Sequence, residues 1–451
     1  MKQIFAAASP FEIICLRAGI LSGDYDVDEH VTERILLVIN TANVVELTPN
    51  VVDLPGVAPL MDVFDRAIDL NATLDPISPS SFAPKAADLP IWERLLRSYW
   101  KLGDENIELV LESPQVNPGI ALGRIFHNAR LRVHSDGLMT YGPSRNKVPL
   151  SMRQRMATIH YLPLVPEVQP LAYTESGAAL LEVDADSFSE SLATYVTSLR
   201  NTGQPILSND PAVQLPGGAT AVAVGQYLAP LGLMTEEEED QLHVQMAQDA
   251  ANAGAETLIF KPHPKAPPIS NANVEQAAER RGMRFILSDT PVIAEALYAY
   301  VRPAIVIGCF STSLATAELL GVPDVRAVGT QQVLAQLTPY QNANRIPATI
   351  TDARYNAAAP DTSVSDLITA VSFVMQPEIR SDLRDEAHRI IDGLPEQLRT
   401  RYFRRRRLTA SRMPGGTRTV KNRAVDAARD FSRIGTARVK QTIKRKAMPK
   451  R

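Results

Sequence analysis

Three short motifs in this chain combine residue types that could bind a phosphate or move a proton. Lys261-Pro262-His263-Pro264 follows the apolar run TLIF, GCFSTS (308–313) follows AIVI, and His134-Ser135-Asp136-Gly137 follows LRV. An imidazole can hydrogen-bond or protonate a phosphate, and a carboxylate can accept a proton from a hydroxyl. Together the motifs could provide a phosphate pocket and a proton acceptor.

Two of the three motifs, the one with the histidine and the one with the row of hydroxyls, predict one phosphate pocket. In open α/β folds ligands bind at the carboxyl ends of parallel strands, where both motifs are expected. Pro262 and Pro264 would fix the backbone around His263, and the hydroxyls of 311–313 would lie at a helix start, where free N–H groups favour an anion. The alternatives are a loop histidine held by two prolines, and ordinary N-capping, which needs only one hydroxyl.

Asp136 is the candidate base. At the end of a strand, and followed by Gly137, it could lie on a tight turn facing a cleft and take a proton from an incoming hydroxyl. Asp-Gly is also a common turn dipeptide, so a plain turn is the alternative.

Alternating strands and helices are expected to position these motifs. Continuous apolar runs are typical of strands covered on both faces, and their alternation with helices favours a parallel sheet. Thr235 and Glu238 form a capping box that predicts a helix to about Ala253. The stretch from about 55 to 90 is irregular and rich in proline, and the pattern weakens between about 144 and 202. The predicted strands cover 4–8, 35–39, 107–111 and 131–134 in the first half, and 219–224, 257–260, 284–287, 304–307 and 324–328 in the second.

This pattern predicts an α/β protein with two Rossmann-like lobes and a cleft between them, the architecture called GT-B. The predicted boundaries are 1–165 for the first lobe, 166–202 for a linker, 203–395 for the second lobe and 396–451 for a basic tail, helical or disordered. The aspartate motif falls in the first lobe and both phosphate motifs fall in the second. The cleft is therefore expected to bring them together.

Charge is divided unevenly along the 451 residues. Residues 401–451 hold 18 Lys or Arg and two acids, a net charge of +16, whereas the first 400 residues carry 29 bases and 48 acids, a net charge of −19. The segment 404–451 could associate with an anionic membrane surface or with another polyanion, of which nucleic acid is the less favoured. A plain solvated tail is the other alternative.

Other features exclude several classes of protein. Cys15 and Cys309 provide neither a disulfide framework nor a metal site, and no acidic cluster has metal-ligand spacing, so no metal is expected. No apolar run approaches the roughly 20 residues that span a bilayer. Pro10 and Glu12 interrupt the apolar N-terminus, which predicts a first strand and a cytoplasmic protein. Glu236 to Asp240 is expected to be a solvated helical turn, and a structural role is expected for His30, His127, His160, His243 and His388.

On these motifs the chain resembles the bacterial sialyltransferases and alpha-2,8-polysialyltransferases of GT-B type. Those enzymes carry an acidic pair followed by glycine in the first lobe, and a His-Pro pair and a Ser/Thr-rich motif in the second. The matching segments are SDGLMTYG (135–142), KPHP (261–264) and GCFSTSLATAELLG (308–321), and Gly225-Gln226-Tyr227-Leu228 after ATAVAV resembles the first turn of the nucleotide lobe. The resemblance covers roughly residues 1 to 395. The chain departs from it at Ser135, where the family has its first acid.

The resemblance implies an inverting, metal-independent glycosyltransferase that moves sialic acid from CMP-sialic acid, without a further cofactor, to a cell-surface glycan or lipid-linked acceptor. Asp136 would be the general base, in an acceptor-side loop with Ser135 and Gly137, and His263 would stabilise or protonate the departing phosphate. Such an enzyme would work in the cytoplasm, or at the inner face of the cell membrane through residues 404–451. The donor-binding residues would be Gly225, Gln226, Pro264, Ser311, Thr312 and Ser313.

Two other functions stay open at this point. A transferase that uses another CMP-ketose or a different nucleotide sugar would tolerate the same phosphate pocket. The chain could also be a non-catalytic relative that binds a polyanion or a membrane. In that case the serine at position 135, in place of the family's first acid, would reflect a loss of activity.

Overall fold

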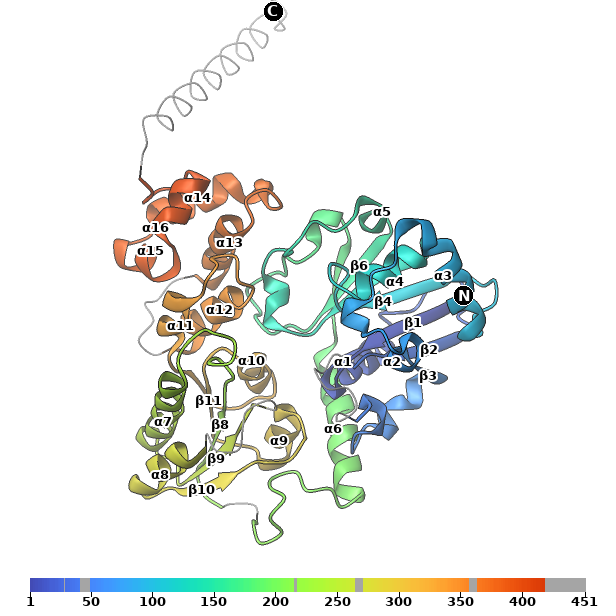
Figure 1. Ribbon diagram of the computed structural model, residues 1–451. Coiled ribbons are helices and arrows are strands. Elements are labelled where there is room, and N and C mark those ends of the chain that lie inside the picture. Colours follow the sequence, from blue (N-terminus) through green and yellow to red (C-terminus); the bar gives the residue numbers. More distant parts are fainter. Residues whose placement is uncertain (28, 41–48, 215–216, 264–270, 357–362, 418–451) are drawn as a thin grey trace, which may run out of the picture.

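The first lobe is built on one parallel sheet of seven strands. The computed structural model describes residues 1–27, 29–40, 49–214, 217–263, 271–356 and 363–417. The strand order in the first sheet is β3-β2-β1-β4-β5-β6-β7, and every neighbouring pair runs parallel (Figure 1). The strands are β1 (Lys2–Ala7), β2 (Glu33–Val38), β3 (Arg66–Asp69), β4 (Ile107–Leu111), β5 (Arg130–Ser135), β6 (Met156–Tyr161) and β7 (Ala179–Glu182).

Both faces of this sheet are buried, which explains its continuous apolar runs. Successive side chains of β1 point to opposite faces: Ile4 packs in one apolar cluster with residues of α3 and α4, and Phe5 packs in another with residues of α1 and α6. The helices of this part are α1 (Pro10–Leu21), α2 (Leu70–Leu74), α3 (Leu89–Tyr99), α4 (Gly119–Ile125), α5 (Leu150–Arg153) and α6 (Ala185–Asn201).

The second lobe repeats this plan with a five-stranded parallel sheet of order β10-β9-β8-β11-β12. Helices cover it on both sides, again enclosing two apolar clusters. Its strands are β8 (Thr220–Val224), β9 (Thr257–Lys261), β10 (Arg284–Leu287), β11 (Ile305–Gly308) and β12 (Asp324–Ala327). Its helices are α7 (Glu236–Asn252), α8 (Ala272–Arg280), α9 (Ala294–Val301), α10 (Thr312–Leu319) and α11 (Thr330–Gln336).

Two helices hold the lobes together. α6 packs against α1 of the first lobe and α9 of the second. α12 (Arg345–Tyr355) of the second half packs against the turn Leu138–Tyr141 that follows β5. Gly142, at the end of that turn, lies so close to α12 that a Cβ there would be 2.4 Å from Cγ1 of Ile346. A side chain at this position would force the lobes apart. The glycine therefore allows the turn next to the aspartate motif to lie close to α12.

The two-lobed α/β architecture predicted from the sequence is confirmed, as are the five strands of the second half. The prediction of a linker over 166–202 missed two elements, because β7 adds a strand to the first sheet and α6 forms the joint between the lobes. β3 and β6 were also missed. β3 and β7 are short edge strands with half-exposed side chains, so they lack the long apolar run of a central strand.

The start of the predicted basic tail is part of the folded second lobe. After α12 the chain forms α13 (Val364–Met375), α14 (Arg384–Gly393), α15 (Glu396–Tyr402) and α16 (Arg405–Ser411). Tyr402, Phe403 and Leu408 are buried, and Arg407 donates hydrogen bonds to the carbonyls of Val374 and Met375 at the end of α13. Residues 396–417 of the predicted helical or disordered tail thus form two helices, but they pack on the second lobe and do not form a separate tail. Residues 418–451 lie outside the described part.

None of the helices in the described ranges is both long and apolar enough to cross a bilayer.

Candidate functional site

A cavity of about 600 Å³ lies between the lobes, and all three sequence motifs contribute to its lining. The first lobe supplies the start of α1 and the turn after β5, including Ser9, Asp136 and Gly137. The second lobe supplies the segments that follow β8, β9 and β11, and the start of α9. The lining therefore comes from the carboxyl ends of parallel strands in both lobes, the usual place for a ligand in such folds.

The two walls touch where the aspartate motif meets the Ser/Thr motif. The backbone N–H of Leu138 donates to Oγ1 of Thr312 at 3.3 Å. A Cβ on Gly137 would lie 3.4 Å from the same oxygen. Ser135 faces its own turn, where its hydroxyl hydrogen-bonds that of Thr140. The turn is thus held against the start of α10 by the backbone, and the Asp136 carboxyl is left facing the cavity.

The carboxyl of Asp136 belongs to a group of three carboxylates in the first lobe. Glu112 directly follows β4, and Glu12 lies in the first turn of α1, where its side chain accepts hydrogen bonds from the N–H of Ala8 at 2.8 Å and the hydroxyl of Ser9 at 3.0 Å. β1, β4 and β5 are adjacent in the sheet, so their carboxyl ends bring the three side chains together. We refer to Glu12, Glu112 and Asp136 as the carboxylate group.

Proximity and burial shift the ionisation of this group. Desolvation first, and repulsion from Glu112 second, raise the pKa of Asp136 to about 7. Burial and the charge of Asp136 likewise raise the pKa of Glu12 well above its usual value, and burial raises the pKa of Glu112. A carboxyl with a pKa near 7 is suited to accept a proton at neutral pH.

His263, on the opposite wall, is stacked on an aromatic ring. Its imidazole lies 5.2 Å from the ring of Tyr227, centroid to centroid, with 12° between the planes. Tyr227 comes from the loop after β8 and His263 from the loop after β9, and both line the cavity. The stack therefore orients the imidazole at the cavity wall.

The loop after β8 passes very close to the loop that carries His263. A Cβ on Gly225 would lie 3.0 Å from the Phe260 ring and 3.1 Å from Cα of Pro262. A side chain at this position would therefore require the neighbouring loop to shift. The Gln226 side chain lines the cavity but lies near carbonyls of its own loop, at 3.4 Å from the oxygens of Val224 and Gly225.

Two side chains of α7 hold the loop after β8 in place through hydrogen bonds to its backbone. Nε2 of His243 accepts a hydrogen bond from the N–H of Gln226 at 3.1 Å. The carboxylate of Glu239 accepts from the N–H groups of Leu228 and Ala229 at 2.6 and 3.0 Å. The interpretation of Glu236 to Asp240 as a wholly solvated turn is wrong for Glu239, which is buried because it caps the loop. The predicted capping box of Thr235 and Glu238 is confirmed.

The three hydroxyls at the start of α10 differ in their partners. Ser311 is the N-cap, and its oxygen accepts from the N–H of Ser313 at 3.2 Å and from the hydroxyl of Ser313 at 2.7 Å. Thr312 faces the first lobe through its contact with Leu138. All three line the cavity. Ordinary capping thus occurs at Ser311, and it leaves the Thr312 side chain at the cavity wall.

A buried lysine and a buried glutamate complete the second wall. Lys261, at the end of β9, donates from Nζ to the carbonyl of Thr290 at 3.2 Å, and burial lowers its pKa to about 8. Glu295, in the first turn of α9, accepts from the hydroxyl of Thr316 at 2.7 Å. Burial raises the pKa of Glu295, and the nearby Lys261 opposes that shift. Both residues line the cavity.

The structure thus brings Asp136 and Gly137 of one lobe together with Gly225, His263 and the hydroxyls of 311–313 of the other in one cavity. Pro264 lies outside the described residues. No role was predicted for Lys261 or Tyr227, although each lies in a motif that the sequence singles out. Glu12, Glu112 and Glu295 were not predicted as site residues, and the available signal was that each lies directly after a strand or at a helix start.

Within the described ranges, no group of three or more His, Cys, Asp or Glu side chains is arranged to hold a metal ion. Cys15 and Cys309 are both buried and unpaired. Desolvation raises the pKa of both thiols, so neither is activated as a nucleophile.

The comparisons with known proteins connect these motifs to a family. The family model described as alpha-2,8-polysialyltransferase (POLYST) matches residues 3–328, a range that contains all three motifs. No curated protein sequence matches the chain.

Two solved structures show weak similarity to the chain. A sialyltransferase GT-B domain from Photobacterium damselae shares 13% identity over 78% of this chain and 96% of its own, with a TM-score of 0.39. MurG from Acinetobacter baumannii shares 10% identity over 87% of this chain and 94% of its own, with a TM-score of 0.38. At these TM-scores the two structures support no conclusion about mechanism. The assignment to the family rests on the sequence match alone.

Proposed function

Since this chain belongs to the alpha-2,8-polysialyltransferase family, we propose that its interlobe cavity binds CMP-sialic acid and transfers the sugar to a glycan hydroxyl. Family membership makes the protein a glycosyltransferase with a nucleotide-sugar donor and a glycan acceptor. The identity of the donor and the roles of individual residues are the proposal.

One observation carries this proposal: a single cavity is lined by Asp136 from the first lobe and by His263 from the second. A transferase needs a proton acceptor on the acceptor side of the sugar and charge stabilisation on the leaving-group side. Because the two residues come from opposite walls, a sugar held between them would meet both requirements at once.

On the donor side, the second lobe offers several groups that suit a phosphate. His263 would hydrogen-bond or protonate the departing phosphate of CMP. The positive end of the α10 dipole, with Thr312 at its first position, would stabilise the phosphate charge. Lys261 adds a positive charge at the same wall. Gly225 would allow the nucleotide to approach the backbone closely.

On the acceptor side, Asp136 would accept the proton of the attacking hydroxyl. The acceptor oxygen forms a bond to the anomeric carbon, the bond from that carbon to the phosphate oxygen breaks, and the electron pair leaves with CMP. Attack from the face opposite the phosphate inverts the anomeric centre. The donor sugar carries its own carboxylate, so a base whose pKa is raised to about 7 adds less negative charge near it than an ordinary aspartate would.

The proposal is tested by CMP release from CMP-sialic acid with a glycan acceptor. Asp136→Ala and His263→Ala should each abolish most of the release. Asp104→Ala and His388→Ala are matched controls, because both residues are exposed and lie outside the cavity. Unchanged turnover in both cavity variants would refute the assigned roles. Faster release from another CMP-ketose or another nucleotide sugar would favour the alternative donor.

We also propose that the protein works in the cytoplasm and associates with the inner face of the membrane through residues 404–451. Arg404, Arg405 and Arg406 are exposed at the start of α16, and each basic residue near an anionic surface contributes about 1 kcal/mol of attraction. A strong decrease in vesicle binding when salt is raised would support this electrostatic contact, and salt-independent binding would argue against it.

A further inference from the structure

The outer face of α3 carries an exposed apolar stripe. Ile91, Leu95 and Tyr99 follow one another at intervals of four residues, so they lie along one side of the helix. Their exposed fractions are 61%, 53% and 67%, and they are three of the nine large hydrophobic residues that are exposed in the described part of the chain. The opposite side of α3 is already packed, since Leu96 and the following Trp100 are buried in the first lobe. An apolar stripe that does not serve the core indicates a contact surface.

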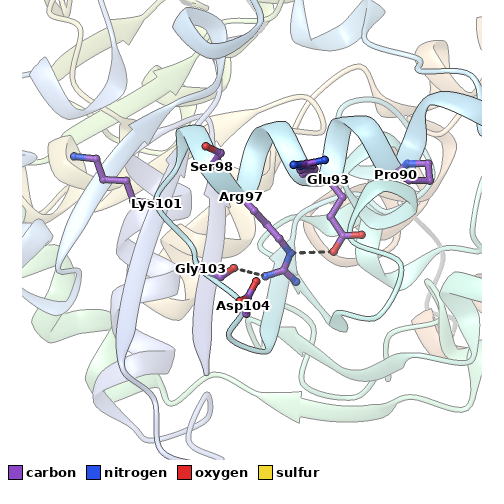
Figure 2. A pocket seen from close by; sticks show the side chains of 8 residues that line it. Pro90, Glu93, Arg97, Ser98, Lys101, Gly103 and Asp104 are labelled. Atoms are coloured by element: carbon purple, nitrogen blue, oxygen red, sulfur yellow. Dashed lines mark hydrogen bonds and ion pairs between the residues drawn. The ribbon is translucent and has the colours of Figure 1, made fainter.

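Positive charge borders the stripe. A groove runs along one side of α3, and in it Arg97 turns toward Glu93 and Gly103 (Figure 2). The guanidinium of Arg97 donates to the carboxylate of Glu93 at 3.1 Å and to the carbonyl of Gly103 at 3.0 Å. By contrast, Arg94 and Lys101 line the same groove and form no ion pair with any described residue. These two exposed cations remain available to a partner.

The helix is weakly basic within an acidic part of the chain. Residues 85–101 hold four Lys or Arg and two acids, a net charge of +2, whereas the first 400 residues carry −19. Asp104, which follows this range, is an exposed acid in the same groove, so the exposed cations outnumber the exposed acids there by one. A stripe of apolar side chains with aromatic residues and flanking cations matches the boundary of an anionic bilayer. There the apolar groups enter the headgroup region, and the basic groups meet lipid phosphates.

We propose that the outer face of α3 is a contact surface for an anionic lipid bilayer, with Ile91, Leu95 and Tyr99 as the inserted residues and Arg94 and Lys101 as the headgroup contacts. A second copy of the chain fits less well. A two-fold pairing of α3 about Leu95 would bring the two Arg94 side chains together, which is a like-charge contact. Lipid phosphates meet the same arginine with opposite charge.

The position of α3 allows the enzyme to work while it is bound. Figure 1 shows α3 on the side of the first lobe away from the second lobe, and no residue of the stripe lines the interlobe cavity. This surface also differs from the basic segment 404–451, which belongs to the other half of the chain. Membrane contact through α3 would thus involve none of the residues that line the cavity.

The chain contains a built-in reporter for this contact. Its only two tryptophans are Trp92 and Trp100, which lie within and directly after α3. We therefore suggest measuring tryptophan fluorescence of the full chain with vesicles of phosphatidylcholine and phosphatidylglycerol that carry brominated acyl chains. Bromine quenches only nearby rings, so quenching reports insertion of α3 and is insensitive to binding through 404–451 alone.

The expected result is quenching with the mixed vesicles and little with pure phosphatidylcholine. Ile91→Ser/Leu95→Ser should remove most of the quenching, and Arg94→Ala should weaken vesicle affinity about fivefold. Leu21→Ser/Leu150→Ser is the matched control, because these leucines are also exposed and lie on other helices, and it should quench like the parent chain. Circular dichroism would check that each variant is folded.

Three outcomes would overturn the proposal. Vesicle binding without quenching would assign the membrane contact to residues 404–451 alone. No vesicle binding at all would remove the bilayer as a partner. A dimer of the parent chain that becomes monomeric in Ile91→Ser/Leu95→Ser, without any quenching by lipid, would assign the stripe to a second copy.

Discussion

The first-lobe wall of the cavity carries Asp136, with the carboxylates of Glu12 and Glu112 close enough to shift its ionisation, whereas the second-lobe wall carries Lys261, His263 and the start of α10. Burial acts on both walls and has opposite consequences. It raises the pKa of the Asp136 carboxyl, which favours proton uptake, and it lowers the pKa of Lys261. The same sheet architecture thus provides the proposed base on one side and the proposed phosphate site on the other. Substitutions at four positions test whether the two walls divide the reaction in this way.

The largest effect is expected from Asp136→Asn, which keeps the shape of the side chain and removes its basicity. We expect kcat to fall by about 10²- to 10⁴-fold, the usual contribution of a general base. Affinity for CMP should stay the same, because the phosphate is bound by the other wall. Turnover by CMP release and binding of CMP by calorimetry measure the two quantities separately. If the variant lost CMP binding as much as turnover, phosphate binding could not be assigned to the second-lobe wall alone.

His263→Ala should have the next largest effect, and it should act on both quantities. We expect kcat to fall by about 10²- to 10³-fold, as for loss of one preorganised charge-stabilising group, together with weaker CMP binding. The same two assays apply. If CMP binding were unchanged and only acceptor affinity fell, His263 would belong functionally to the acceptor side.

The division of labour could be predicted only in part from the sequence. The apolar runs ILLVI, IELVL and AIVI mark central strands, and the carboxyl ends of such strands are where ligands bind. This is why Asp136, His263 and the hydroxyls of 311–313 could be placed at one cleft before the structure was known. A different rule, the alternation of side chains along a strand, explains why successive residues of β1 pack on opposite faces of the sheet.

The carboxylate group could not be predicted because its members lie more than 120 residues apart between Glu12 and Asp136. They meet only because β1, β4 and β5 are neighbours in the sheet, and strand order is not readable from local pattern. The stack of Tyr227 on His263 was missed for the same reason, since β8 and β9 bring two loops together. The fold of residues 404–417 was missed because their high charge hides the apolar contacts of Leu408 and Met413.

A smaller effect is expected from Tyr227, which orients His263 without reacting. Tyr227→Ala should lower kcat by roughly two- to tenfold, the range expected for loss of one aromatic pair, and Tyr227→Phe should retain nearly full turnover because the ring stays. Steady-state kinetics of both variants provide the measurement. Equal losses in both would show that the hydroxyl matters and that stacking does not.

The smallest effect, a shift in pH dependence, is expected from Glu112→Gln. Asp136 must be ionised to accept a proton, so kcat/KM should rise as pH increases through about 7. The charge of Glu112 raises the pKa of Asp136 by repulsion, so its removal should move this rising limb to lower pH. A pH profile of kcat/KM for both proteins measures the shift. A limb that stays in place, or moves to higher pH, would separate Glu112 from the base.

A crystal structure of the chain with CMP bound tests the central claim most directly. The account predicts that the phosphate lies in the interlobe cavity between His263 and the start of α10, with the Asp136 carboxyl across the space that the sugar would fill. A phosphate bound away from His263, or an Asp136 carboxyl turned out of that space, would contradict it.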